Sequence, residues 1–157
     1  MDNISIVYLE NNENNIEVVS DLILKDTSQK CFSNKDIEGN IIPIEDLASL
    51  YLEYTDMYGI KFLDKFIGLL SLTNENEISI FVEPNYQNKG IGKYSLILFE
   101  NLIKEKYEVN TLVAEVTCDN VESVRLLVNN GYIKTDESRE VPINSTYVKV
   151  IKYVKEI

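Results

Sequence analysis

The sequence contains no histidine among its 157 residues. Histidine has the side-chain pKa nearest to neutral and is the commonest general base and metal ligand in enzymes. Its absence excludes Ser-His and Cys-His nucleophilic dyads, and it excludes zinc held by imidazole. Any proton transfer carried out by this chain must therefore use carboxylates, tyrosine, lysine or water.

Basic side chains are also scarce. Fifteen Lys and Arg stand against 26 Asp and Glu, which gives a formal net charge of −11 and a pI near 4.5. Sequence-independent binding to nucleic acid depends on neutralising phosphates with Lys and Arg, so we expect no nucleic-acid partner. Residues 1–82 carry a net charge of −10 and residues 83–157 carry −1. The acidic half is either a solvated surface or one that attracts a cationic ligand.

Long hydrophobic runs are missing, as is a basic N-terminal region followed by an apolar segment. Without a candidate membrane span or secretion signal, we expect a cytoplasmic protein with no membrane contact. The only two cysteines, Cys31 and Cys118, fit no metal-binding spacing. We expect two ordinary buried thiols in a reducing compartment and no metal site.

The remaining composition is that of a folded domain, since 45% of the residues are hydrophobic, and we predict one domain over residues 1–157. Hydrophobic periodicity predicts a helix from about Asn15, one from Pro43 to Gly59, one from Ile91 to about Lys106, and a short one after Asp119-Asn120. Four residues share one side of the last helix: Val121, Val124, Leu127 and Val128. Strands are predicted over residues 4–9, 60–63, 66–72, 78–82, 111–116, 132–141 and 146–154.

The most informative stretch follows the strand at 78–82. It reads Val82-Glu83-Pro84-Asn85-Tyr86-Gln87-Asn88-Lys89-Gly90-Ile91-Gly92-Lys93. Its two glycines permit close backbone approaches, and the next helix opens with unpaired amides and a positive dipole end that suit a phosphate. The stretch lacks the ending of a Walker loop and the third glycine of the dinucleotide fingerprint. The pattern therefore indicates either an unusual phosphate site or a plain capping turn.

Two blocks of this sequence resemble a known family. Gln87-x-x-Gly90-x-Gly92, after a strand ending Val82-x-Pro84, resembles the acetyl-coenzyme A pyrophosphate loop of the GNAT superfamily of N-acetyltransferases. The second block, Glu115-Val116-x-x-x-Asn120-x-x-Ser123-x-x-x-Leu127-x-x-x-Gly131-Tyr132, is similar to the strand, Asn-capped helix and Gly-aromatic exit of that family. The Asn120, Ser123 and Leu127 pattern is closest to the branch of ribosomal-protein and related N-terminal acetyltransferases.

The resemblance covers essentially the whole chain and implies an α/β (α+β) fold. We expect a mixed, twisted central sheet of about six or seven strands flanked by about four helices. The sheet would splay between the strands at 78–82 and 111–116, so that pantetheine lies in the gap. Residues 1–82 would form the acceptor-side half and residues 83–157 the acetyl-CoA-side half.

The resemblance also implies the residues that bind the cofactor. Backbone groups of Phe81 and Val82 would bind pantetheine and polarise the thioester carbonyl, because oriented amides stabilise a developing oxyanion. Asn120 and Ser123 would contact the pantetheine or the adenosine end. The pyrophosphate would lie on the backbone amides of Gln87, Asn88, Lys89, Gly90, Ile91, Gly92 and Lys93. Lys89 and Lys93 either add positive charge there or are simply solvated.

The implied reaction is direct transfer of acetyl to a primary amine, which needs a base for the ammonium proton. Glu115 matches a glutamate of alanine-acetylating relatives, and Glu77 begins the strand that leads to the loop. Either could act directly or through water, and either could instead face solvent. Many relatives have, at the position of Leu127, a tyrosine that acts as general acid and protonates the leaving thiolate. This chain has no such residue there, so no dedicated general acid is predicted. We interpret Cys118 as a packing residue.

We therefore predict an acetyl-CoA-dependent N-acetyltransferase, monomeric or homodimeric. Its acceptor would be a cationic amine, because the acidic half borders the acceptor cleft. Polyamines, aminoglycoside-like amines, peptide N-termini and lysine all satisfy this condition. The missing tyrosine motivates an alternative, a catalytically degenerate sensor that binds CoA or acyl-CoA. A third possibility is an interaction protein whose glycine loop is only a turn.

Overall fold

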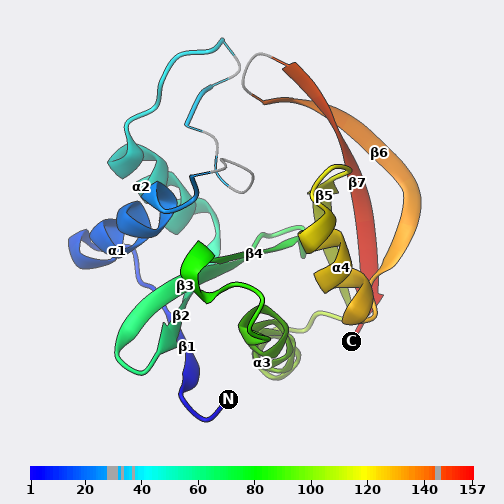
Figure 1. Cartoon of the computed structure of the whole chain (residues 1–157), viewed down its shortest axis with the longest axis horizontal. Coiled ribbons are helices and arrows are strands. Elements are labelled where there is room, and N and C mark those ends of the chain that lie inside the picture. Colours follow the sequence, from blue (N-terminus) through cyan, green and yellow to red (C-terminus); the bar gives the residue numbers. More distant parts are fainter. Residues whose placement is uncertain (28–31, 33, 37, 144–145) are drawn as a thin grey trace.

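The computed structural model describes residues 1–27, 32, 34–36, 38–143 and 146–157 (Figure 1). Seven strands and four α-helices lie within these ranges. Their order is β1 (Ile4–Tyr8), α1 (Glu13–Leu24), α2 (Ile44–Tyr54), β2 (Asp56–Phe62), β3 (Lys65–Leu72), β4 (Ile78–Val82), the 3₁₀ turn η1 (Pro84–Tyr86), α3 (Ile91–Lys106), β5 (Thr111–Thr117), α4 (Val121–Asn129), β6 (Ile133–Ile143) and β7 (Thr146–Glu156).

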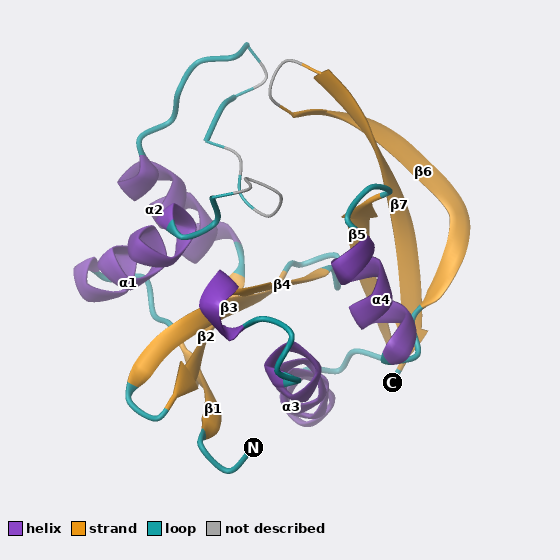
Figure 2. Ribbon diagram, viewed as in Figure 1, coloured by secondary structure: helices purple, strands orange, loops and turns teal. Residues whose placement is uncertain are grey.

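The strands form two sheets that meet at one point. Strands β1-β2-β3-β4 make an antiparallel sheet, and strands β5-β7-β6 make a second one. Among the described residues, β4 and β5 are joined only by a parallel bridge between Glu77 and Val113. Beyond that bridge the two strands diverge (Figure 2). This arrangement confirms the predicted mixed, splayed sheet, and it leaves one edge of β4 unpaired.

Helices cover both faces of the four-stranded sheet (Figure 2). On one face, Leu96, Phe99 and Ile103 of α3 are fully buried, because their spacing of three and four residues places them on one side of the helix. On the other face, α1 and α2 pack against Leu69 and Phe81. Alternate strand residues point to opposite faces, so β4 contributes to both cores.

The boundary between α2 and β2 differs from the prediction. The helix ends at Tyr54, and Gly59 is a strand residue that pairs with Leu69 and Val7. A Cβ on Gly59 would collide with the Phe66 ring, so the glycine makes room for packing and does not stop a helix. Met57 is buried within β2, where its place in the helical stripe was a coincidence of spacing.

Three smaller predictions are also corrected. Helix α1 begins at Glu13, because the Asn12 side chain caps it by accepting from the Asn15 N–H at 2.9 Å. In α4, Val121 and Val128 are 60% and 53% exposed, so the predicted apolar side is incomplete. Cys118 is exposed, so the prediction of a buried thiol there is wrong; Cys31 lies outside the described residues.

The other predicted elements are confirmed within one or two residues at each end. Gly131 has a φ of 87° and follows α4 in the left-handed conformation, which agrees with the glycine exit of the second motif. No helix in the described ranges is long and apolar enough to cross a membrane.

Candidate active site

The gap between β4 and β5 contains two adjoining cavities. The first, of about 270 Å³, extends from Glu77 and Glu115 to Phe32 and Tyr51 on the α1–α2 side, and we call it the inner cavity. The second, of about 250 Å³, lies beside residues 87–93 and α4, and we call it the loop cavity. Both are lined by the same four residues of β4 and α4, which are Ile80, Phe81, Ser123 and Leu126. The two cavities therefore meet along the open edge of β4.

The pairing of β4 fixes which backbone groups face this gap. The Glu83 N–H donates to the Ile67 carbonyl on the β3 side at 2.8 Å, whereas the Asn76 carbonyl accepts from Val113 of β5 at 2.9 Å. Because the polar backbone groups of successive strand residues point to opposite edges, odd-numbered residues of β4 bond to β3. The backbone groups of Ile80 and Val82 therefore face the gap.

This register changes one predicted position. The Phe81 backbone faces β3, while its side chain lines both cavities. Sequence reasoning missed Ile80, because the edge to which a residue's amide points depends on the pairing with β3 and not on residue type. The Val82 carbonyl already accepts a hydrogen bond from Gln87 Nε2 at 2.7 Å. The Val82 amide remains on the gap side.

The loop after β4 turns sharply into α3. Asn88 and Gly90 have φ angles of 59° and 78°, both left-handed, and Gly90 is the N-cap residue without a side-chain cap. The first amides of a helix have no partner within it, so the N–H groups of Ile91, Gly92 and Lys93 remain without a helical acceptor. The motif thus produces the uncapped helix start that the sequence predicted.

The start of α3 differs in charge from the starts of the other α-helices. Helices α1, α2 and α4 each carry an acidic residue in the first turn, which complements the positive end of the dipole. Helix α3 carries none, and Lys93 lies in its first turn. The resulting positive charge is open toward the loop cavity.

Five of the seven predicted loop residues line the loop cavity: Gln87, Asn88, Gly90, Gly92 and Lys93. The Ile91 side chain is instead buried in the core. Lys89 Nζ lies 5.8 Å from the centroid of the Tyr86 ring. Helix α4 supplies the opposite wall with side chains that sequence reasoning did not select: Glu122, Arg125 and Asn129.

Asn120 and Ser123 lie where the second motif predicts, at the start of α4. The Asn120 Oδ1 accepts from the Ser123 N–H at 3.3 Å, so this buried side chain caps the helix. Both residues line the inner cavity. Leu127 is also buried against the inner cavity, and its side chain offers no acidic proton.

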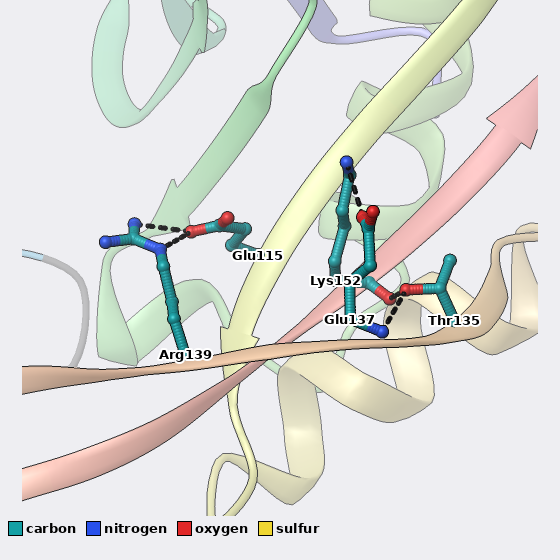
Figure 3. Close-up of polar contacts among 5 residues, drawn as sticks. All are labelled: Glu115, Thr135, Glu137, Arg139 and Lys152. Carbon is teal, nitrogen blue, oxygen red and sulfur yellow. Dashed lines mark hydrogen bonds and ion pairs between the residues drawn. The ribbon is translucent and has the colours of Figure 1, made fainter.

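The two candidate bases both line the inner cavity, but their surroundings differ. Glu115 Oε2 accepts from Arg139 Nε at 2.9 Å and from Arg139 Nη2 at 2.5 Å (Figure 3). Glu77 has no ion pair within the described part of the chain. Burial raises the pKa of Glu77, the nearby Glu115 raises it further, and the Arg139 charge partly offsets both. Glu77 therefore combines a raised pKa with the lack of an ion-pair partner among the described residues, whereas Glu115 is held by Arg139.

The acidity of residues 1–82 is not concentrated at the inner cavity. Of the 15 acids in that half, only Glu77 lines it, and Glu115 of the second half is its neighbour. The charge at the inner cavity is thus set by these two carboxylates and Arg139, not by the half as a whole.

Comparison with known proteins gives a family and a set of similar folds. The family model described as the acetyltransferase (GNAT) family matches residues 24–132. None of the curated proteins matches the chain. The solved structure of RimL, a ribosomal L7/L12 alpha-N-protein acetyltransferase in complex with coenzyme A, has a TM-score of 0.80 at 16% identity, covering 100% of this chain and 96% of that one.

Two further structures have similar folds and different named substrates. The ribosomal-protein-S5-alanine acetyltransferase of Vibrio fischeri has a TM-score of 0.76 at 14% identity, covering 99% of this chain and 94% of that one. The spermidine N-acetyltransferase of Vibrio cholerae, in complex with CoA and spermine, has a TM-score of 0.80 at 15% identity, covering 99% and 96%. At these identities the likeness concerns the fold.

Proposed function

The chain belongs to the acetyltransferase (GNAT) family, and we propose that it transfers acetyl from acetyl-CoA to a primary amine where its two cavities meet. One observation carries the assignment of the site. Strands β4 and β5 separate after a single bridge, and the open β4 edge runs from Glu77 toward the uncapped start of α3. A donor lying along that edge would reach both cavities.

The residues around the loop cavity suit the phosphate end of coenzyme A. A pyrophosphate is a strong hydrogen-bond acceptor, and an uncapped helix start with a lysine in its first turn supplies amides and positive charge. Pantetheine is a chain that contains amides, so it can pair with an open strand edge as an added strand does. We assign the amides of residues 87–93 to the pyrophosphate and the backbone groups of Ile80 and Val82 to pantetheine.

The chemistry follows from the inner cavity. The donor supplies a thioester, whose carbonyl carbon bonds to the neutral amine nitrogen while the carbon–sulfur bond breaks and the thiolate leaves. The nitrogen then gives up its excess proton through water, and the thiolate takes up a proton from water. An amide of the β4 edge would donate to the carbonyl oxygen and stabilise its developing negative charge. Glu77 would remove the ammonium proton, directly or through water, because its raised pKa makes it a stronger base than an ordinary glutamate. Asn120 and Ser123 would contact the donor.

A two-part experiment tests this function. First, coenzyme A should raise the melting temperature of the chain, since a ligand at a hundredfold excess over its dissociation constant stabilises the folded state by about 2.7 kcal/mol. Second, adding an amine should release thiol from acetyl-CoA. A thermal shift without amine-dependent thiol release would reduce the site to a binding module. The absence of a thermal shift would leave the glycine loop as only a turn.

A further inference from the structure

A third cavity adjoins the inner cavity on its outer side. It has a volume of about 210 Å³ and is lined by Glu115, Glu137, Ser138, Arg139, Val150 and Lys152. Glu115, Arg139 and Val150 line the inner cavity as well. We call this third space the side cavity. The two cavities therefore adjoin at the Glu115–Arg139 pair.

The side cavity has no excess of either charge. Arg139 pairs with Glu115, and Lys152 Nζ lies 2.6 Å from Glu137 Oε2 (Figure 3). A polyamine brings a second ammonium group, and here that group would meet the cationic Arg139 and two carboxylates that already have partners. The side cavity therefore does not select a second positive charge.

An irregularity in β6 places Arg139 at this position. Lys134 pairs with Tyr153 and Ser138 with Ile151, so β6 contains two more residues than β7 over this stretch. The Thr135 hydroxyl fixes the bulge by donating to the Lys152 carbonyl at 2.8 Å. Bulges redirect the side chains that follow them. Arg139 comes directly after the bulge and reaches across β7 to Glu115 on β5.

The Arg139 guanidinium is only partly used by Glu115. Two of its nitrogens donate to the same oxygen, Glu115 Oε2, and the third points away from it (Figure 3). In the described ranges, no other group accepts from this guanidinium, and its side chain is 62% exposed. Guanidinium has five N–H donors and strongly favours carbonyl and carboxylate oxygens. It therefore has donors left for a ligand oxygen.

We propose that Arg139 determines acceptor specificity by binding an oxygen next to the acceptor amine. The acceptor is then an α-amino acyl group: its amine lies at Glu77, and its carbonyl or carboxylate oxygen lies on Arg139. Such a group occurs in free amino acids and at peptide N-termini. This inference rests on the proposed function and names the substrate class of the same site.

The missing histidine favours the same class of acceptor. An α-amino group has an ordinary pKa of about 7.7–8.0, against about 10.4 for a lysine amine. A carboxylate base therefore removes the proton of an α-amine at a smaller energetic cost. A chain whose best candidate base is Glu77 is better matched to α-amines than to lysine side chains or polyamines.

The test compares three acceptors on wild-type protein and two variants. The acceptors are a short peptide with a free N-terminus, the free amino acid of its first residue, and 1,4-diaminobutane, which has no oxygen. We expect wild type to prefer the peptide or the amino acid. Arg139→Gln should lower kcat/KM for those acceptors by about 10- to 100-fold, the effect of losing a hydrogen bond to a charged group. With the diamine, measured at a pH above the acid limb of both proteins, the loss should be much smaller.

Lys149→Gln is the matched control, because it removes a cation of β7 that lines none of the three cavities. It should not change the preference among the three acceptors. The kcat/KM of Arg139→Lys for the peptide and the amino acid should fall between those of wild type and Arg139→Gln. An ammonium keeps the positive charge but lacks the planar, forked donor geometry of guanidinium. In Arg139→Gln, the acid limb of the pH profile should move to higher pH, because the Arg139 charge lowers the pKa of Glu77. A retained thermal shift with coenzyme A would confirm that the variant is folded.

The outcomes separate this inference from the proposed function. Equal losses for peptide and diamine in Arg139→Gln, or a wild type that prefers the diamine, would overturn the inference and leave the acetyltransferase intact. No thiol release with any amine would overturn the function itself. A preference for the peptide over the amino acid identifies a chain N-terminus, and the reverse identifies a small molecule; both support the α-amino acyl acceptor.

Discussion

The loop cavity and the inner cavity share a wall but are built in different ways. The loop cavity has one wall formed by the glycine-containing segment 87–93 at the uncapped start of α3, and an opposite wall formed by α4. The inner cavity is lined by residues of β2, β3, β4, β5, β6, β7, α2 and α4, together with Phe32, Glu77 and Asn120. A phosphate at the first would meet the backbone amides of the helix start, whereas a ligand of the second meets individual carboxylates and aromatic rings.

This difference indicates how each cavity can change. A backbone site requires glycine at a few positions and tolerates replacement of most side chains. A side-chain site changes with each substitution, so related chains can keep one donor and use different acceptors. The named substrates of the similar structures, ribosomal proteins and spermidine, are consistent with this division. Variants on the two sides of the shared wall should therefore have different effects.

The largest expected effect is that of a substitution in the loop cavity. Gly92 lines the loop cavity, and a Cβ there would meet only ordinary van der Waals contacts, the nearest at 3.7 Å from Leu126 Cδ2. Gly92→Glu should place a carboxylate where the pyrophosphate is assigned and abolish the thermal shift with coenzyme A. Gly92→Ala should weaken the shift without removing it. An undiminished shift in Gly92→Glu would move the donor elsewhere.

In the inner cavity, substitutions of the two carboxylates should differ in their effect on kcat. Glu77→Gln should lower kcat by about 10²- to 10⁴-fold, the usual contribution of a general base, and should leave coenzyme A binding unchanged. Glu115→Gln should cost less, because Glu115 is held by Arg139. Steady-state kinetics with one amine, alongside binding of coenzyme A, measures both. A larger loss in Glu115→Gln would reverse the assignment of the base.

The raised pKa of Glu77 also predicts opposite pH effects on activity and stability. Activity should fall as the pH drops through this pKa, which lies above the ordinary value of 4.5. Stability should change the other way, because ionising a carboxyl whose folded-state pKa is raised disfavours the folded state. The free energy of unfolding should decrease as pH rises from about the ordinary value through the folded-state pKa.

Denaturant unfolding of wild type and Glu77→Gln across that pH range measures this effect. The variant should lack this part of the pH dependence and be more stable than wild type at neutral pH. If Glu77→Gln is less stable than wild type at neutral pH, then the ionised Glu77 stabilises the folded state, and the expected destabilisation by its ionisation is wrong.

The smallest expected effect concerns the lysines at the start of α3. Lys93→Ala should weaken coenzyme A binding by about two- to fivefold, as for a charge near an exposed helix end, and added salt should reduce the difference. Lys89→Ala is the matched control, because Lys89 lies over Tyr86 and does not line the loop cavity. If both substitutions weaken coenzyme A binding equally, the lysines act through the overall electrostatic potential and not through a local contact of Lys93 with coenzyme A.

The sequence predicted the loop cavity better than the inner cavity, for a physical reason. A glycine pair followed by a helix is a local pattern, and Gly90 takes the left-handed conformation that such a pattern requires. Arg139 has no local signal of this kind. Its role depends on a bulge in β6 and on a partner 24 residues away.

Glu77 illustrates an intermediate case. Its place at the start of β4 was predicted, but the face to which its side chain points depends on register, and a slip of one residue reverses it. Similarly, the end of α2 was misplaced because Met57 and Gly59 fit both a helical stripe and a strand. Pairing with β1 and β3 decided between them, and that pairing is not local information.

The single bridge between Glu77 and Val113 also has a mechanical consequence. The sheets share a hydrophobic core, but in the described ranges β4 and β5 are hydrogen-bonded to each other at this end only, so a rotation of one sheet against the other would pivot there. A small rotation of one sheet against the other displaces Val82, about 16 Å along the strand, far more than it displaces Glu77. The open end of the gap between β4 and β5 can thus adjust to a long, flexible donor while the proposed base keeps its position.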